Sequence, residues 1–149
     1  MVWLLAVALL CLGGCTQPDE VDVAIAPLVQ RIEEEQSKLN SLPSEADLKT
    51  RFASIYVLDQ APRGFMGEIM SGDLPEEDKA AAHTKVSGIM AEQDPKNLQI
   101  VLEHLPPEEW YLRSRHGIEV ATTAFLVVQH SSLETWRRFV PVLEPLVAS

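Results

Sequence analysis

The segment that decides the fold is the most apolar stretch outside the N-terminus, His116-Gly117-Ile118-Glu119-Val120-Ala121-Thr122-Thr123-Ala124-Phe125-Leu126-Val127-Val128-Gln129-His130. No polar residue interrupts it between Ala124 and Val128, which favours a helix that other helices surround. A strand is the competing interpretation, because valine, threonine and phenylalanine favour extended backbone. We expect a helix, because the run is long and the other segments have helical spacing.

The remaining apolar positions predict an all-α fold, a single compact bundle of about five to seven helices. A first amphipathic helix is expected from about Asp22 to Asn40. The other expected features are a helix start at Ser44, a loop or frayed helix end over residues 64–73, helix starts at Pro75 and Asp94, a short helix over 108–115 that presents Trp110 and Tyr111, and a last helix capped by Ser131.

The N-terminus is an uninterrupted apolar run from Met1 to Cys15, which indicates an export signal. The run is shorter than the roughly 20 residues that a membrane-spanning helix needs. Its end, Leu12-Gly13-Gly14-Cys15, resembles the lipobox of bacterial lipoproteins. The resemblance implies that Cys15 carries the lipid anchor, with fatty acids such as palmitate, and becomes the new N-terminus. The run departs from the usual pattern because it has no Lys or Arg near Met1, and an ordinary secretory signal cut near Cys15 is the alternative.

These features divide the chain into a signal peptide (1–14), a lipidated cysteine with a tether (15–22) and a helical domain (23–149). Cleavage would leave 149 − 14 = 135 residues, enough for one domain. Thr16, where an aspartate would favour retention in the inner membrane by resemblance to other lipoproteins, favours the periplasmic face of the outer membrane.

The charge of the chain limits its partners. It has 22 acidic and 12 basic residues, a net charge of −10, which argues against binding nucleic acid or anionic lipid head groups. Attachment to the membrane is therefore expected through the lipid. With Cys11 removed and Cys15 acylated, the domain would have no disulfide and no thiolate metal site.

A carboxylate occupies an inward position on the second expected helix. Its apolar stripe runs Leu48, Phe52 and Ile55, and the next position is Asp59. Burial of a carboxylate is costly unless the group is paired, and Arg63 is four residues further on the same face.

Two motifs resemble a bacterial family that is classed only as a domain of unknown function. The first is Asp-Gln-x-x-Arg at residues 59–63, and the second runs from Arg115-His116-Gly117 to an aliphatic segment closed by Gln129-His130. The resemblance covers roughly Ser44 to Val147 and implies a mostly helical domain without a known activity. The positions that match the family are Asp59, Gln60, Arg63, Gly117, Gln129 and His130. Longer relatives continue with a segment that contains Asp-Arg and a Tyr-Gly-Thr-Gln-like ending, which this chain lacks.

Two interpretations of these polar residues remain open. Asp59, Arg63 and His130 could converge on one pocket beside Gln60 and Gln129, where a carboxylate-oriented histidine and an arginine suit acid/base chemistry on a small acidic substrate. The structural interpretation, which we favour, pairs Asp59 with Arg63 and lets Gln129 and His130 cap helix ends.

No other motif indicates chemistry. The four histidines show no metal-binding spacing, and phosphate-loop and dinucleotide patterns are absent, so we expect neither a metal nor a cofactor. His116 and Gly117, beside Arg115, are secondary candidates for an anion site at a helix start; an exposed basic turn is the alternative.

The sequence therefore predicts a membrane-tethered interaction or structural module of the cell envelope, whose helical surface binds an envelope protein. The alternative is a small enzyme or ligand-binding domain that uses the Asp/Arg/His cluster, and we regard an enzyme as the weaker hypothesis.

Overall fold

The computed structural model describes residues 19–107 and 109–147. The expected signal peptide and Cys15 lie outside these residues. The described part is all-α, without a strand, as the sequence predicted. Its helices are α1 (Glu20–Ser41), α2 (Leu48–Ser71), α3 (Glu76–Glu103), α4 (Arg113–His116), α5 (Ile118–Gln129) and α6 (Leu133–Val147).

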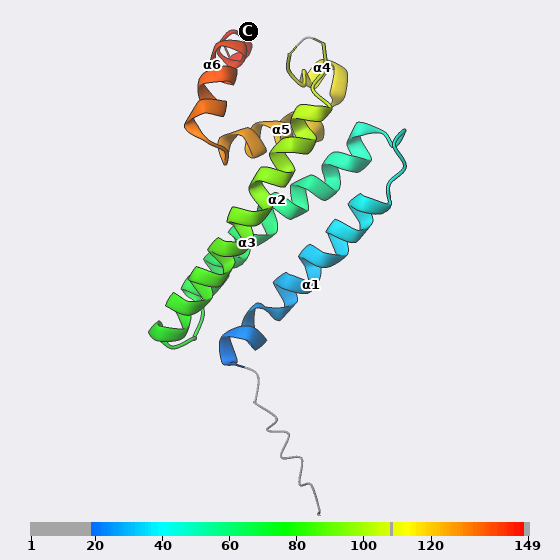
Figure 1. Ribbon diagram of the computed structural model, residues 1–149. Coiled ribbons are helices and arrows are strands. Elements are labelled where there is room, and N and C mark those ends of the chain that lie inside the picture. Colours follow the sequence, from blue (N-terminus) through cyan, green and yellow to red (C-terminus); the bar gives the residue numbers. More distant parts are fainter. Residues whose placement is uncertain (1–18, 108, 148–149) are drawn as a thin grey trace, which may run out of the picture.

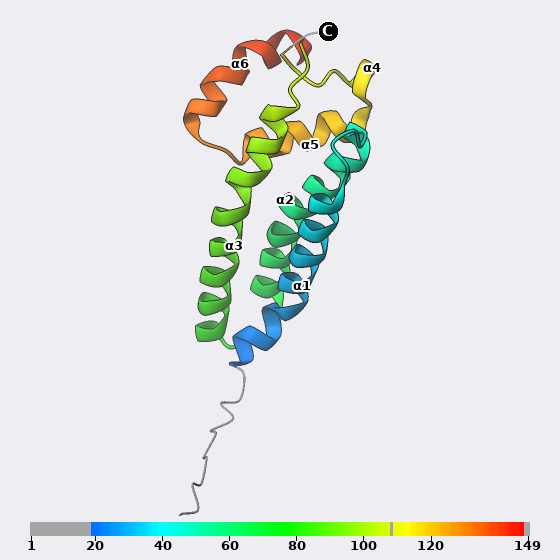
Figure 2. The same cartoon turned by 45° about the vertical axis from the view of Figure 1, so that its right-hand side comes forward.

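Three long helices form a bundle, and three shorter helices gather at one of its ends. Figures 1 and 2 show α1, α2 and α3 side by side, with α4, α5 and α6 at the end where α3 finishes. The first described residues lie at the opposite end of the bundle (Figure 1). We call residues 109–147 the cap. No helix among the described residues is both long and apolar enough to cross a bilayer.

Aspartates and acidic first turns begin the long helices. Asp19 accepts a hydrogen bond from the Val21 N–H at 3.1 Å, and Asp47 accepts one from the Thr50 N–H at 2.8 Å. The first turn of α3 carries three acidic residues against the positive end of the helix dipole, Glu76, Glu77 and Asp78. These side chains compensate backbone N–H groups that have no partner within the helix.

Several expected helix boundaries are wrong by a few residues. α1 begins at Glu20, inside the segment expected to be a tether, because Asp19 caps it. α2 begins after Asp47 and not after Ser44, whose hydroxyl donates to Glu45 instead. At α6 the cap is Ser132, which accepts from the Thr135 N–H, whereas Ser131 donates to the Val128 carbonyl.

Fewer helices begin or end at glycine or proline than the sequence suggested. The segment 64–73, expected to be a loop or a frayed helix end, is part of α2 as far as Ser71. The expected helix start at Asp94 is instead the middle of α3, which continues through Pro95. In the segment expected to be a short helix over 108–115, the described residues are helical only from Arg113, and Trp110 and Tyr111 are buried before α4 begins. Tertiary packing therefore overrides local preference in these segments.

Two hydrophobic clusters lie along the bundle. The upper cluster includes Phe52, Ile55 and Leu58 of α2 together with buried residues of α3, α5 and α6. The lower cluster is formed by Val21, Ile25, Leu28, Ile69, Ala82 and Val86. Ile32 of α1 packs against both. The upper cluster attaches the cap to the bundle, and the lower one holds together the end near the described N-terminus.

The helix α5 is less enclosed than its composition suggested. Val120, Ala124, Val127 and Val128 are buried in the upper cluster. Phe125, however, is 41% exposed, so other helices do not surround α5 on every side. The helix keeps an apolar face toward solvent.

The turn into α5 requires glycine. Gly117 has φ 85° and ψ 163°, a region that only glycine adopts without strain. We expect Gly117→Ala to lower the free energy of unfolding by about 1–3 kcal/mol, measured by urea denaturation.

Gly88 is the matched control. It lies inside α3, and a Cβ built there meets nothing within 4 Å. Gly88→Ala should raise the free energy of unfolding by about 0.5–1 kcal/mol. Equal effects of the two substitutions would contradict the assigned backbone of the turn.

Candidate functional site

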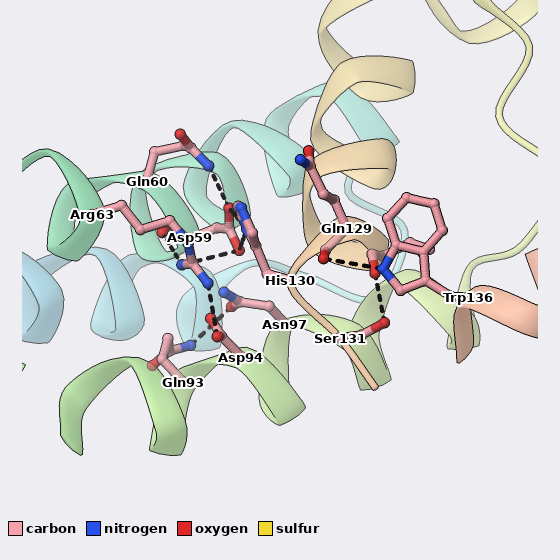
Figure 3. Close-up of polar contacts among 11 residues, drawn as sticks. Asp59, Gln60, Arg63, Gln93, Asp94, Asn97, Gln129, His130, Ser131 and Trp136 are labelled. Atoms are coloured by element: carbon pink, nitrogen blue, oxygen red, sulfur yellow. Dashed lines mark hydrogen bonds and ion pairs between the residues drawn. The ribbon is translucent and has the colours of Figure 1, made fainter. Parts of the chain in front are cut away.

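The carboxylate of Asp59 is the centre of a polar cluster between α2, α3 and the end of α5. The residue is 1% exposed. His130 Nδ1 lies 3.1 Å from Asp59 Oδ1 and 3.0 Å from Oδ2, and the Gln60 amide donates to Oδ2 at 2.6 Å (Figure 3). The structure thus brings together Asp59, Gln60 and His130, which the sequence had proposed as neighbours.

Arg63 extends the cluster from α2 to α3. Its Nη1 donates to the Asp59 backbone carbonyl and lies 3.5 Å from Asp59 Oδ1. Its Nη2 donates to Asp94 Oδ2 at 2.7 Å (Figure 3). Asp94 was missed in the sequence because Asp94-Pro95 resembles a helix start. One guanidinium therefore connects two carboxylates on neighbouring helices.

The cluster separates the two hydrophobic clusters. On α2, Asp59 and Arg63 lie between Leu58 of the upper cluster and Ile69 of the lower one. On α3, Asp94 lies between Val86 and Val101 in the same way. We call this level of the bundle the polar layer.

Two buried amides complete the polar layer on α3. Gln93 donates to Asn97 Oδ1 at 2.9 Å, and both side chains are buried. Asn97 Nδ2 and Asp94 Oδ1 have no hydrogen-bond partner among the described residues. The sequence could have indicated that these amides are buried, because helical spacing places them on the same face of α3 as the buried Val86 and Val101.

The remaining candidates of the sequence lie elsewhere. The Gln129 side chain is exposed and points away from Asp59 (Figure 3). Only its backbone carbonyl takes part in a contact, accepting from Trp136 Nε1 at 3.2 Å. His116 packs its ring against Tyr111 with centroids 5.7 Å apart, and Gly117 shapes the turn into α5.

Tyr111 is a buried structural residue of the cap. Its hydroxyl donates to the Val101 carbonyl at 2.6 Å, inside the upper cluster. Burial raises the pKa of Tyr111 above its usual value, because the charged phenolate is disfavoured away from water. The side chain is therefore an uncharged anchor between the cap and α3.

The arrangement restricts the chemistry that the polar layer can perform. Asp59 orients His130 through Nδ1, and the other ring nitrogen has no hydrogen-bond partner among the described residues. No serine or threonine hydroxyl in the described part is hydrogen-bonded to His130, so a nucleophile of the triad type is not assembled there. Nor do the described residues contain a group of three or more potential metal ligands.

Two grooves border the polar layer. A groove of about 580 Å³ between α1 and α3 includes Gln93, and another of about 390 Å³ between α1 and α2 includes Gln60. Neither is lined by Asp59, Arg63 or His130. Asp59 is enclosed, whereas the side chains of Arg63 and His130 are 22% and 21% exposed.

Searches of protein-family models, curated proteins and solved structures found no significant match to the chain.

The contact between Asp59 and His130 should be measurable as a coupling energy. We expect Asp59→Ala to lower the free energy of unfolding by about 1–3 kcal/mol, since it removes the carboxylate that His130 and Gln60 share, whereas Arg63 keeps Asp94. His130→Ala should cost about 1–3 kcal/mol. The double variant should lose about 0.5–3 kcal/mol less than the sum of the single variants.

Lys49→Ala provides the control, because the Lys49–Glu119 pair is 71% and 62% exposed and should not affect stability measurably. Strict additivity of the Asp59 and His130 substitutions would show that their contact does not stabilise the fold.

Proposed function

We propose that the protein is a lipid-anchored interaction module of the bacterial cell envelope, held through Cys15 on the periplasmic face of the outer membrane. The observation that carries this proposal is an exposed, largely apolar surface where the cap meets α2. It consists of Ile118, Thr122 and Phe125 on α5 and Tyr56 on α2, and we call it the α5 face. Ile118 is 52% exposed and Tyr56 is 46% exposed.

Hollows on both sides of α5 extend this surface. One of about 370 Å³ lies toward α2 and is lined by Ala53 and Tyr56. The other, of about 500 Å³, lies toward α6 and is lined by Trp110 and Leu143. Thr122 borders both hollows. Exposed apolar side chains beside hollows are typical of a protein contact site.

The α5 face is remote from the proposed anchor. α1 has 22 residues and is therefore about 33 Å long, and its start lies at the end of the bundle opposite the cap. Cys15 precedes Asp19 by four residues, which span at most about 14 Å. The helices would hold the α5 face away from the anchoring bilayer, where a protein can reach it.

A structural role for the polar layer agrees with this proposal. Asp59, Arg63 and His130 bind one another across α2, α3 and the end of α5. The family suggested by the two motifs would then share these residues as a means of joining the cap to the bundle. The alternative is an enzyme or a ligand-binding domain that uses this cluster. It is favoured by the 21% exposure of the His130 side chain and by the buried Asn97 Nδ2 and Asp94 Oδ1 atoms that have no partner among the described residues.

Metabolic labelling with a fatty acid tests the anchor. The full chain expressed in a bacterium should incorporate the label and fractionate with the outer membrane. Cys15→Ser should abolish incorporation, because the thiol is the acylated group. Thr16→Asp serves as a matched variant, which should keep the label but move the chain to the inner membrane. Labelling of the Cys15→Ser variant, or none of the parent chain, would refute the lipid anchor.

A further inference from the structure

We propose that the groove between α1 and α3 binds a primary alkylammonium ion. The ammonium group lies at Gln36 and Gln93, and the alkyl chain extends along the apolar part of the groove. This inference goes beyond the proposed function, because α1 and α3 take no part in the α5 face. It also does not depend on the lipid anchor.

One face of each helix forms this groove, which we call the α1–α3 groove. Its volume is about 580 Å³, within the range of roughly 300–1,000 Å³ that ligand pockets span. Ile32, Gln36 and Asn40 line it from α1 at intervals of four residues, and Ile89 and Gln93 line it from α3 at the same interval. The groove therefore follows the helix axes.

Two glutamine side chains present hydrogen-bond acceptors to the groove. Gln36 donates its amide to Asn40 Oδ1 at 3.1 Å, and Gln93 donates to Asn97 Oδ1 at 2.9 Å. Gln36 Oε1 is buried and has no hydrogen-bond partner among the described residues.

Gln93 is 5% exposed, and its Oε1 is likewise without a partner in the described part of the chain. Figure 3 shows its nitrogen turned toward Asn97 and its oxygen on the other side. Unpaired acceptors away from bulk water destabilise a fold, so a ligand that supplies N–H donors gains by binding here.

The charges that line the groove favour a cation. They are two acidic residues and one basic residue, a net charge of 1 − 2 = −1. Lys96 is paired with Glu92 at 2.7 Å, whereas Glu33 has no ion-pair partner among the residues that the structure describes. The whole chain has a net charge of −10, which attracts cations and repels anions.

The lower part of the groove is apolar. Val29 and Ile89 pack against the lower cluster, and Ile32 packs against both clusters. The helices α1 and α3 run in the same direction (Figures 1 and 2), so both contribute their apolar residues to the same end. Gln36 follows Val29 by seven residues and Gln93 follows Ile89 by four, which correspond to about 10 Å and 6 Å along the two helices.

A primary alkylammonium ion matches both ends of the groove. Its head has three N–H donors, and the groove offers three acceptors that lack a partner: Gln36 Oε1, Gln93 Oε1 and the Glu33 carboxylate. Its chain buries apolar surface against Val29 and Ile89. A quaternary ammonium ion lacks the donors, and a metal ion lacks the chain.

Calorimetric titration of the full chain in a nonionic detergent tests the site with pentylammonium as the probe. We expect saturable binding with a Kd on the order of 1 mM, as suits so small a ligand. Pentanol and pentanoate have the same chain with a neutral and an anionic head. Each should bind at least about tenfold more weakly, because neither supplies a cationic donor.

Gln36→Met tests the assigned acceptor. The substitution keeps the length of the side chain and removes the carbonyl oxygen, so the affinity for pentylammonium should fall about tenfold. The midpoint temperature of unfolding should not fall, because the lost oxygen is buried without a partner. Gln30→Met is the matched control, an exposed glutamine of α1 that does not line the groove, and it should leave the affinity unchanged.

The same ammonium chemistry occurs in free amines and in the lysine side chains of proteins. Nα-acetyl-lysine N-methylamide separates these sources. Tighter binding of this probe than of pentylammonium would support the site and assign it to a lysine of a protein partner, and weaker binding would support the site and assign it to a free amine.

Two results would overturn the proposal. The first is binding of pentanoate as tight as that of pentylammonium. The second is an affinity for pentylammonium that Gln36→Met leaves unchanged or that Gln30→Met lowers equally. Neither result bears on the anchor, since the titration does not depend on where the chain is held.

Discussion

The contact between the Asp59 carboxylate and the His130 ring joins two parts of the chain that are 71 residues apart. It links the middle of α2 to the residue that follows α5, so together with the upper cluster it holds the cap on the bundle. Gln60 and Arg63 complete the environment of the carboxylate, and Arg63 carries the network on to Asp94 of α3. Without these partners a carboxylate that is 1% exposed would destabilise the fold by several kcal/mol.

The polar layer also coincides with a proline in each of two long helices. Pro62 precedes Arg63 in α2, and Pro95 follows Asp94 in α3. Each proline removes a backbone hydrogen bond within its helix. The ion pair between Arg63 and Asp94 joins these two turns directly. Apolar clusters alone allow helices to pack in more than one register. A polar network between two such clusters specifies one alignment of the helices, which is the best supported role of buried ionic groups.

The sequence predicted the parts of this arrangement that depend on helical spacing. The position of Asp59 on an apolar stripe indicated its burial, and the end of the most apolar segment indicated His130 as its partner. The place of Asp94 in the cluster was not predicted, because Asp-Pro is a common helix start. In the structure α3 continues through Asp94, whose side chain pairs with Arg63. Gln129 was wrongly placed in the cluster, because the chain leaves the helix at His130 and turns the glutamine side chain outward. The sequence did not indicate the exposed α5 face, because the apolar composition of this segment predicted a buried helix.

The polar layer helps to hold the cap on the bundle, and the α5 face therefore keeps a constant shape. If α5 could shift on α2, the exposed residues around Thr122 would not keep the spacing that a specific contact needs. Native-state amide hydrogen exchange tests this central dependence most directly. In the parent chain, α5 should open with the same free energy as α2 and α3; in Asp59→Ala, α5 and α6 should open at lower free energy than the lower part of the bundle. Equal loss of protection throughout the chain, or unchanged protection of α5, would contradict the account.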